Sequence, residues 1–219
     1  YPSPLCLAIW KFDNVFTGSS YVGGLVGQAV STSLTSSDSV DNQITINLVQ
    51  TNTLHTLNYL GGAIGYLSGE DARTSGVYDT VVNATINDVY ATNLGGIVGY
   101  SNRATIEGST ANGEITNSLL NTNSYIGAVV GRANSSIISA NTVYLTFDIT
   151  IQGSATTNIG AVAGRLTTSD GLDCQLINCQ IAYPFVNQTV IEGSAIADIG
   201  LYGYSTQTNV IVSGCTTIE

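Results

Sequence analysis

The stretch from Asn93 to Gly99, Asn-Leu-Gly-Gly-Ile-Val-Gly, decides the fold, because its pattern recurs along the whole chain. The pattern is a polar or aromatic residue, an aliphatic residue, Gly, a small residue, two mostly apolar residues and Gly. It occupies Tyr21–Gly27, Tyr59–Gly65, Asn93–Gly99, Tyr125–Gly131, Asn158–Gly164 and, shortened, Asp198–Gly203. The first glycines are Gly23, Gly61, Gly95, Gly127, Gly160 and Gly200, with steps of 38, 34, 32, 33 and 40 residues. Such a period is the mark of a repeat architecture.

Short β-rich runs lie between these segments, such as Thr105–Thr110 and Tyr144–Ile151. Val, Ile, Thr and Tyr fill them, and Gly, Ser, Asn and Asp separate them, as expected for strands and turns. Each repeat therefore holds about three strands of ordinary length. A propeller blade would need a longer period, and six near-identical hairpin sets do not suit a sandwich.

The pattern predicts an all-β fold, a parallel β-solenoid or β-helix of about six coils with about three strands per coil. Equivalent residues would then stack roughly 4.8 Å apart. A variant with two smaller coils per repeat fits the same arithmetic. Residues 21–219 form the solenoid domain, and residues 1–20 are an N-terminal extension that either caps the first coil or supplies a strand to a second subunit.

Gly24-Leu-Val-Gly27 and its five relatives, each followed by Ser-, Asn- and Ile-rich runs, resemble the GLUG repeats of bacterial and protist surface proteins. The resemblance covers about residues 21–215. It implies a solenoid ectodomain of the kind found in adhesins and other secreted proteins, and it carries over no catalytic residue. Together with the preference of parallel crossovers, it favours a right-handed coil.

The composition excludes several classes of function. Charged residues make up 9% of the chain and the net charge is −10, so no basic surface for nucleic acid is expected. Apolar runs such as Leu5–Trp10 are far shorter than the roughly 20 residues of a membrane span. The chain has 219 residues, no Met and one His. We expect an extracellular or cell-surface protein whose Tyr1 follows a processing cut, for example after a signal peptide.

Two kinds of covalent modification fit that location. Asn83, Asn134 and Asn187 begin N-glycosylation sequons. The even number of cysteines favours disulfides over a metal site; the candidates are Cys6, Cys174, Cys179 and Cys215. Cys174 and Cys179 are close enough in sequence to bridge. Cys6 and Cys215 belong to opposite ends, roughly 24 Å apart, beyond the roughly 7 Å limit for a disulfide.

Alternation along the motif gives it two apolar faces. If Val22 points inward, an outward stripe bordered by glycines is expected at Leu25, Ala63, Ile97, Val129, Val162 and Tyr202. Glycine in a strand allows close approach of another backbone, so either the stripe is an interface or the glycines relieve crowding at tight corners. The apolar residues Leu5, Leu7, Ile9 and Trp10 would cover the stripe of this chain or of a second copy.

The residue after each motif also stacks from coil to coil. Apart from Gln28, this column contains Tyr66, Tyr100, Arg132, Arg165 and Tyr204. An aromatic and guanidinium ladder gains roughly 0.5 to 1 kcal/mol per exposed cation–π contact, and it could equally hold a sugar ring. The column is therefore either a structural ladder or a glycan-binding site.

The sequence does not predict an enzyme, a cofactor or a metal site. His55 has no acid or nucleophile beside it. The acidic groups around Glu70, Asp71 and Arg73, and around Asp170 and Asp173, lie in different repeats and would be roughly 14 Å apart. The leading hypothesis is an extracellular structural protein that self-associates, head-to-tail or laterally, into a filament or surface layer. A glycan-binding adhesin domain is the alternative.

Overall fold

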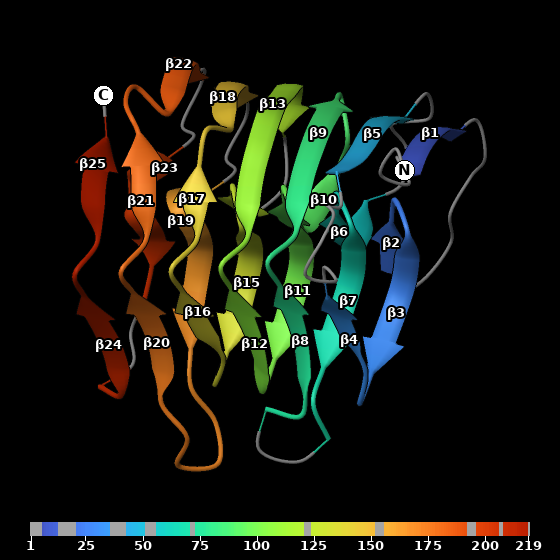
Figure 1. Ribbon diagram of the computed structural model, residues 1–219. Coiled ribbons are helices and arrows are strands. Elements are labelled where there is room, and N and C mark those ends of the chain that lie inside the picture. Colours follow the sequence, from blue (N-terminus) through green and yellow to red (C-terminus); the bar gives the residue numbers. More distant parts are fainter. Residues whose placement is uncertain are drawn as a thin grey trace.

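The computed structural model describes residues 6–12, 21–35, 43–50, 56–70, 73–120, 124–151, 156–191, 196–205 and 208–218. Every regular element assigned in these ranges is a β-strand (Figure 1). Leu5, His55 and Asp71 lie outside the described residues, and so do the side chains of Cys6, Leu7, Ile9 and Trp10.

The strands form three parallel sheets. Sheet A contains β1 (Cys6–Phe12), β5 (Gln43–Gln50), β9 (Val81–Asn87), β13 (Thr110–Leu120), β17 (Thr142–Val143), β18 (Thr146–Ile151), β21 (Gln180–Ala182), β22 (Val186–Ile191) and β25 (Thr216–Ile218). Sheet B contains β2 (Tyr21–Gly23), β3 (Val26–Val30), β6 (Leu57–Gly61), β7 (Ile64–Ser68), β10 (Ala91–Gly95), β11 (Val98–Asn102), β14 (Ser124–Gly127), β15 (Val130–Asn134), β19 (Thr156–Thr167) and β23 (Ile196–Tyr204). Sheet C contains β4 (Ser33–Thr35), β8 (Ser75–Tyr78), β12 (Ala104–Glu107), β16 (Ile137–Ser139), β20 (Cys174–Ile177) and β24 (Val210–Ser213).

Each coil runs through sheet B, then C, then A, and the next coil repeats the path one strand further on. In Figure 1, sheets A and C face the reader and sheet B lies behind them. The register pairs the first glycine of every motif with that of the next coil, in the order Gly23, Gly61, Gly95, Gly127, Gly160, Gly200. The predicted all-β parallel solenoid, with about three strands per coil, is confirmed.

The N-terminal segment pairs within its own chain. Strand β1 runs parallel to β5, in continuous register from Cys6 opposite Ile44 to Phe12 opposite Gln50. It is thus the first strand of sheet A, before the first motif. Sheet A places it six strand steps from β25, roughly 29 Å away.

The core is a set of aliphatic columns inside the three sheets. Leu60, Leu94, Ile126 and Ile159 occupy one register position of sheet B, and all four side chains are fully buried. Burying each such side chain contributes roughly 1.5 to 3 kcal/mol. Columns of this kind explain why the aliphatic position of the motif is Leu or Ile in each of these four coils.

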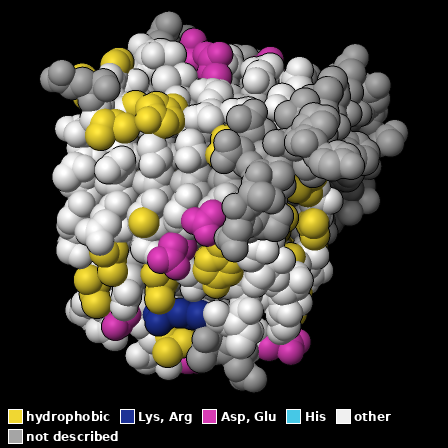
Figure 2. Space-filling model, in the orientation of Figure 1, with side chains coloured by type: hydrophobic (Ala, Val, Ile, Leu, Met, Phe, Trp, Pro, Cys, Tyr) yellow, Lys and Arg dark blue, Asp and Glu magenta, His cyan; other side chains and the backbone are white. Residues whose placement is uncertain are grey.

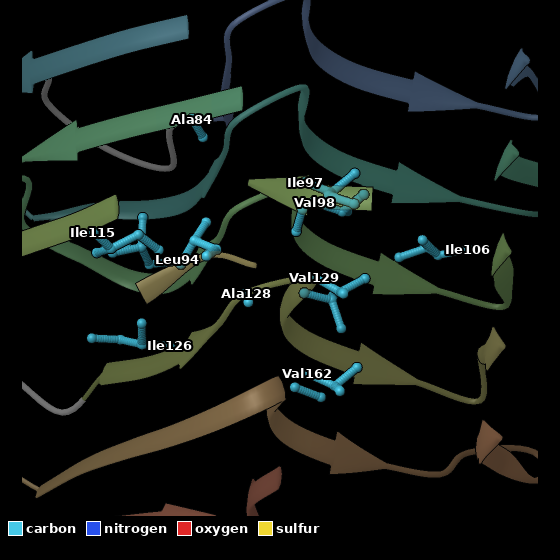
Figure 3. Close-up of a cluster of buried hydrophobic side chains, with 14 of the residues drawn as sticks. Ala84, Leu94, Ile97, Val98, Ile106, Ile115, Ile126, Ala128, Val129 and Val162 are labelled. Atoms are coloured by element: carbon cyan, nitrogen blue, oxygen red, sulfur yellow. The ribbon is translucent and has the colours of Figure 1, made fainter. Parts of the chain in front are cut away.

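The predicted outward stripe is wrong for four of its six members. Ala63, Ile97, Val129 and Val162 are fully buried in the core, and Figure 3 shows Ile97, Val129 and Val162 one beyond another on the inner side of sheet B. Leu25 is half-buried against the core, and Tyr202, in the last coil, is 36% exposed.

A bend at the centre of the motif causes this inversion, and in the first four motifs it separates two strands, such as β6 and β7. The amides of Ala63 and Ile64 both donate to the carbonyl of Ile97, at 2.9 and 3.0 Å. The pairing across the bend stays one to one, since Gly61 pairs with Gly95 and Ile64 with Val98, but the change of direction interrupts the alternation of side chains. The prediction assumed an unbroken strand, so it assigned the residue at the bend to the wrong face.

Candidate functional site

The face formed by sheets A and C offers no continuous feature. In Figure 2 its described surface is mostly polar side chains and backbone, with hydrophobic side chains in separate small patches. The distinctive surface lies on sheet B, where two columns of large side chains flank the buried motif.

The first column is the first motif position, and the second is the position after the motif. Register pairing places Tyr21, Tyr59, Asn93, Tyr125, Asn158 and Asp198 in the first column. It places Gln28, Tyr66, Tyr100, Arg132, Arg165 and Tyr204 in the second, which confirms that these residues stack from coil to coil.

Glycines bring the two columns together. A Cβ atom on Gly65 would lie 2.5 Å from the backbone nitrogen of Val22, and one on Gly99 would lie 2.6 Å from that of Leu60. The second strand of one coil therefore lies directly against the first strand of the preceding coil. The glycine columns allow this close approach within the chain, which matches the alternative that they relieve crowding at tight corners.

At the N-terminal end the paired columns form a cluster of four tyrosines: Tyr21, Tyr59, Tyr66 and Tyr100. Ring centroids lie 5.4 Å apart for Tyr21 and Tyr59 and 5.0 Å apart for Tyr59 and Tyr100, with nearly parallel planes. Tyr66 packs at a tilt against the other three rings. Burial raises the pKa of Tyr59 and of Tyr100, although the Arg132 guanidinium opposes the rise in both. We call these four residues the tyrosine half.

Further along the axis the columns become basic. The Arg132 guanidinium lies 5.3 Å from the centre of the Tyr100 ring. Arg165 lies between two rings, 4.9 Å from the centre of Tyr125 and 5.4 Å from that of Tyr204, and its Nη1 donates to the Tyr125 hydroxyl at 2.8 Å. Neither arginine forms an ion pair with a carboxylate of the described residues. Both charges are thus held against aromatic faces.

A pocket of about 330 Å³ opens beside Arg165. Its lining is Tyr125, Thr156, Asn158, Arg165, Asp198 and Tyr204. Asn158 is 4% exposed, and among the described residues its Oδ1 atom and the Nε atom of Arg165 have no hydrogen-bond partner. A buried polar atom without a partner costs roughly 1 to 3 kcal/mol. The pocket is lined by two aromatic rings, a guanidinium, a carboxylate and a side-chain amide. We call its lining residues, with Arg132, the arginine half.

Sequence reasoning found the second column and missed the first as a site. Tyr125, Asn158 and Asp198 each begin a motif, so the repeat pattern already aligns them. The sequence does not show that the motif bends. The bend brings the first residue of the motif next to the residue that follows its last glycine. That bend depends on the glycine contacts between neighbouring coils, which the repeat alone does not reveal.

The acidic loops lie closer together than the sequence predicted. The Nη2 atom of Arg73 donates to the carbonyl of Asp173 at 2.8 Å, and Arg103 forms an ion pair with Asp170 while its Nη1 contacts the carbonyl of Glu70 at 3.5 Å. The separation of roughly 14 Å was wrong because both loops extend along the solenoid and meet across the coils between them. Among the described residues no cluster of three or more His, Cys, Asp or Glu side chains is placed to hold a metal ion.

The modification candidates differ in their surroundings. Asn187 is exposed, whereas Asn83 accepts a hydrogen bond from Asn112 and Asn134 donates to Asn102 at 2.8 Å. Cys174 is the first residue of strand β20 and Cys179 lies two residues beyond its end, and both are thiols. The extended strand places them more than about 10 Å apart, which is too far for the bridge that their closeness in sequence allowed.

Comparison with known proteins identifies the repeat. The family described as "The GLUG motif" matches residues 90–116, a segment that holds the third motif and the strands after it. No curated protein and no solved structure matches the chain. Within the described residues, no helix is long and apolar enough to cross a membrane. The chain is a parallel β-solenoid that carries the GLUG motif.

Proposed function

We propose that this protein is an extracellular, adhesin-like solenoid that binds carbohydrate in the pocket of the arginine half. The observation that carries the proposal is the pocket beside Arg165, whose lining combines the rings of Tyr125 and Tyr204 with the Arg165 guanidinium and the Asp198 carboxylate. The GLUG motif and the β-helical fold are compatible with a surface protein of this kind. The proposed role is binding without catalysis.

The chemistry of the lining suits a polyhydroxylated ring. The Asp198 carboxylate accepts hydrogen bonds from hydroxyl groups, and the Arg165 guanidinium donates to hydroxyl or ring oxygens. The phenol rings offer flat apolar faces for the C–H face of a sugar. A pocket with a few converging polar groups and aromatic walls is the usual form of a small-ligand site.

A pair of matched variants tests the proposal. Tyr204 and Tyr202 lie on the same strand, β23, and are 37% and 36% exposed, but only Tyr204 lines the pocket. We expect the full chain to bind a subset of sugars on a glycan array. Tyr204→Ala should weaken that binding at least tenfold, because it removes one wall and the face on which Arg165 rests, whereas Tyr202→Ala should leave it unchanged.

Two results would overturn the proposal. One is an array on which the folded chain binds no sugar. The other is equal loss of binding in Tyr204→Ala and Tyr202→Ala, which would place the sugar elsewhere on the last coil. A bound oligosaccharide recovered shortened after incubation would instead indicate an enzyme.

Self-association is a second candidate, supported by the two end coils. In the first coil Val26 and Val30 are each 39% exposed and line a hollow of about 300 Å³ together with Leu34. In the last coil Ile211 and Val212 are 42% and 37% exposed on β24. Apolar side chains beside strand edges favour head-to-tail stacking of copies, which continues into a filament if it does not close. Light scattering at increasing concentration, with electron microscopy of the same material, tests this: a strict monomer at high concentration would exclude it.

A further inference from the structure

One corner of the solenoid, between sheets C and A, carries a column of small side chains that are buried in every coil but the last. The column consists of Thr80, Ser109, Asn141, Cys179 and Cys215. In each coil the residue just before the column has a positive φ; these residues are Asp79, Gly108, Ala140, Asn178 and Gly214. The same backbone hydrogen bond recurs at this corner. The amide of Thr142 donates to the carbonyl of Ser109, and the amide of Thr216 donates to the carbonyl of Cys179, each at 2.9 Å.

In the earlier coils the side chains of this column link neighbouring coils. The amide of Thr80 donates to the Ser109 hydroxyl at 3.2 Å, and the amide of Ser109 donates to the Asn141 side-chain oxygen at 3.0 Å. All three residues are fully buried. The corner is therefore a position where each coil is fastened to the next by a side chain.

The last two coils carry thiols at this position instead. Cys179 Sγ lies 3.9 Å from the carbonyl oxygen of Ile138, and Cys215 Sγ lies 3.9 Å from that of Leu176, which pairs with Ile138. The two side chains thus have the same orientation, one coil apart. A thiol is a weak hydrogen-bond donor and acceptor, so these contacts fasten the coils less well than those of Ser109 and Asn141.

The spacing of the column suits a covalent link. Gln180 pairs with Thr216 in register, so Cys179 and Cys215, the residues just before them, face each other across adjacent strands. Neighbouring strands lie about 4.8 Å apart, inside the range of roughly 4.4 to 6.8 Å between the Cα atoms of a disulfide. We propose that Cys179 and Cys215 form a disulfide that joins the last two coils at the corner where the earlier coils are joined by hydrogen bonds.

The two thiols differ in exposure, which sets the order of the chemistry. Cys179 is fully buried, and burial raises its pKa to about 12, with the neighbouring Cys215 adding to the rise. Cys215 is only half-buried. With a small disulfide such as oxidised glutathione as oxidant, the Cys215 thiolate attacks one sulfur, forms a mixed disulfide and releases one glutathione thiolate. Cys179 loses its proton to solvent, attacks the Cys215 sulfur and releases the second glutathione, so that two thiols become one disulfide and one oxidised glutathione becomes two reduced ones.

The test is oxidation of the folded full-length chain with oxidised glutathione, followed by peptide mass mapping without reduction. We expect one linked peptide pair containing Cys179 and Cys215, lighter by two hydrogens than the reduced pair. The Cys174→Ala variant should give the same product, because Cys174 is the first residue of β20, at the end of that strand away from Cys179. The Cys215→Ser variant should give no link to Cys179.

A second measurement is the thermal stability of the oxidised and reduced protein. Disulfide formation should raise the midpoint of thermal unfolding of the wild-type chain by several degrees, and a reductant should reverse the rise. The Cys6→Ser variant should behave identically, which separates this link from any bond between chains. A stable glutathione adduct on Cys215 without progress to the link, or a link between Cys174 and Cys179, would overturn the proposal.

Discussion

The tyrosine half and the arginine half are built on the same scaffold and end in different surfaces. In both, glycines bring the first and second columns together, and each coil contributes one residue to each column. In the tyrosine half the rings fill the space with one another, with centroids 5.0 to 5.6 Å apart. In the arginine half Asn158 and Asp198 replace rings in the first column, and a pocket opens beside Arg165.

The difference shows that the glycines of the repeat and the outward residues of the two columns have separate roles. The glycines determine how closely the two strands approach, and they are common to both halves. The outward residues vary from coil to coil, and they decide whether the surface packs on itself or leaves room for a ligand. Stability should therefore depend on the tyrosine half and binding on the arginine half.

The largest expected effect falls on the shared scaffold. A Cβ atom would lie 2.0 Å from the Ile64 carbonyl oxygen at Gly61 and 2.1 Å from that of Val130 at Gly127. Gly61→Ala and Gly127→Ala should each cost at least about 3 kcal/mol of unfolding free energy, because backbone must move. At Gly200, in the last coil, the nearest atom would be 3.2 Å away, so Gly200→Ala is the matched control and should cost less than about 1 kcal/mol. Denaturant unfolding measures all three, and tolerance in one half alone would break the comparison.

The next effect distinguishes the halves from each other. Tyr59 contacts three other rings, so Tyr59→Ala should cost roughly 2 to 3 kcal/mol of stability and leave sugar binding by the folded protein unchanged. Arg165→Ala should cost about 1 kcal/mol or less and abolish binding. Unfolding curves and array binding of both variants give the four values. If each variant lost both properties in proportion, the halves would not have separate roles.

The sequence predicted the solenoid and the second column because both depend on a period, and a period is visible without coordinates. Gly23 through Gly200 and Tyr66 through Arg165 stack as expected. Two kinds of information were missing. The bend at Gly62 and Ala63 reverses the side of the stripe, and there the amides of Ala63 and Ile64 share one carbonyl of the next coil.

The second kind of missing information is which loops and corners of different coils contact each other. The contact of Arg73 with Asp173 spans a hundred positions of sequence, and nothing in either loop indicates the other. The sequence alone allows Cys179 and Cys215 to be matched. Gln180 and Ile181 follow Cys179, Thr216 and Thr217 follow Cys215, and each run lies near the end of its repeat. The irregular last step of 40 residues hid that alignment.

Alkaline pH should weaken the tyrosine half. Burial raises the pKa of Tyr59 and Tyr100, so the folded protein holds these protons more tightly than the unfolded chain does. Their contribution to stability is fully present below the unfolded pKa of about 10 and is lost as pH rises through the folded value. The free energy of unfolding should therefore fall above about pH 10, and Tyr100→Phe should flatten that fall.

The control for this pH effect is Tyr144→Phe, which removes a hydroxyl from a ring that is 52% exposed and outside the paired columns. Urea unfolding at several pH values from about 9 to 11 provides the comparison. An equal slope in Tyr100→Phe and the wild type would show that the cluster does not carry the pH dependence.

The smallest effect comes from lengthening the tyrosine half by one coil. Gln28 is exposed, pairs in register with Tyr66 and is the first member of the second column. A ring at this position would stack on Tyr66 as Tyr66 packs on Tyr100, whose centroids are 5.4 Å apart. Gln28→Tyr should therefore stabilise the protein by about 0.5 to 1 kcal/mol. Gln28→Leu adds apolar area without a ring and is the matched control, so a denaturation midpoint that rises equally in both variants would assign the gain to burial alone and remove the stacking of rings as the source of stability in this half.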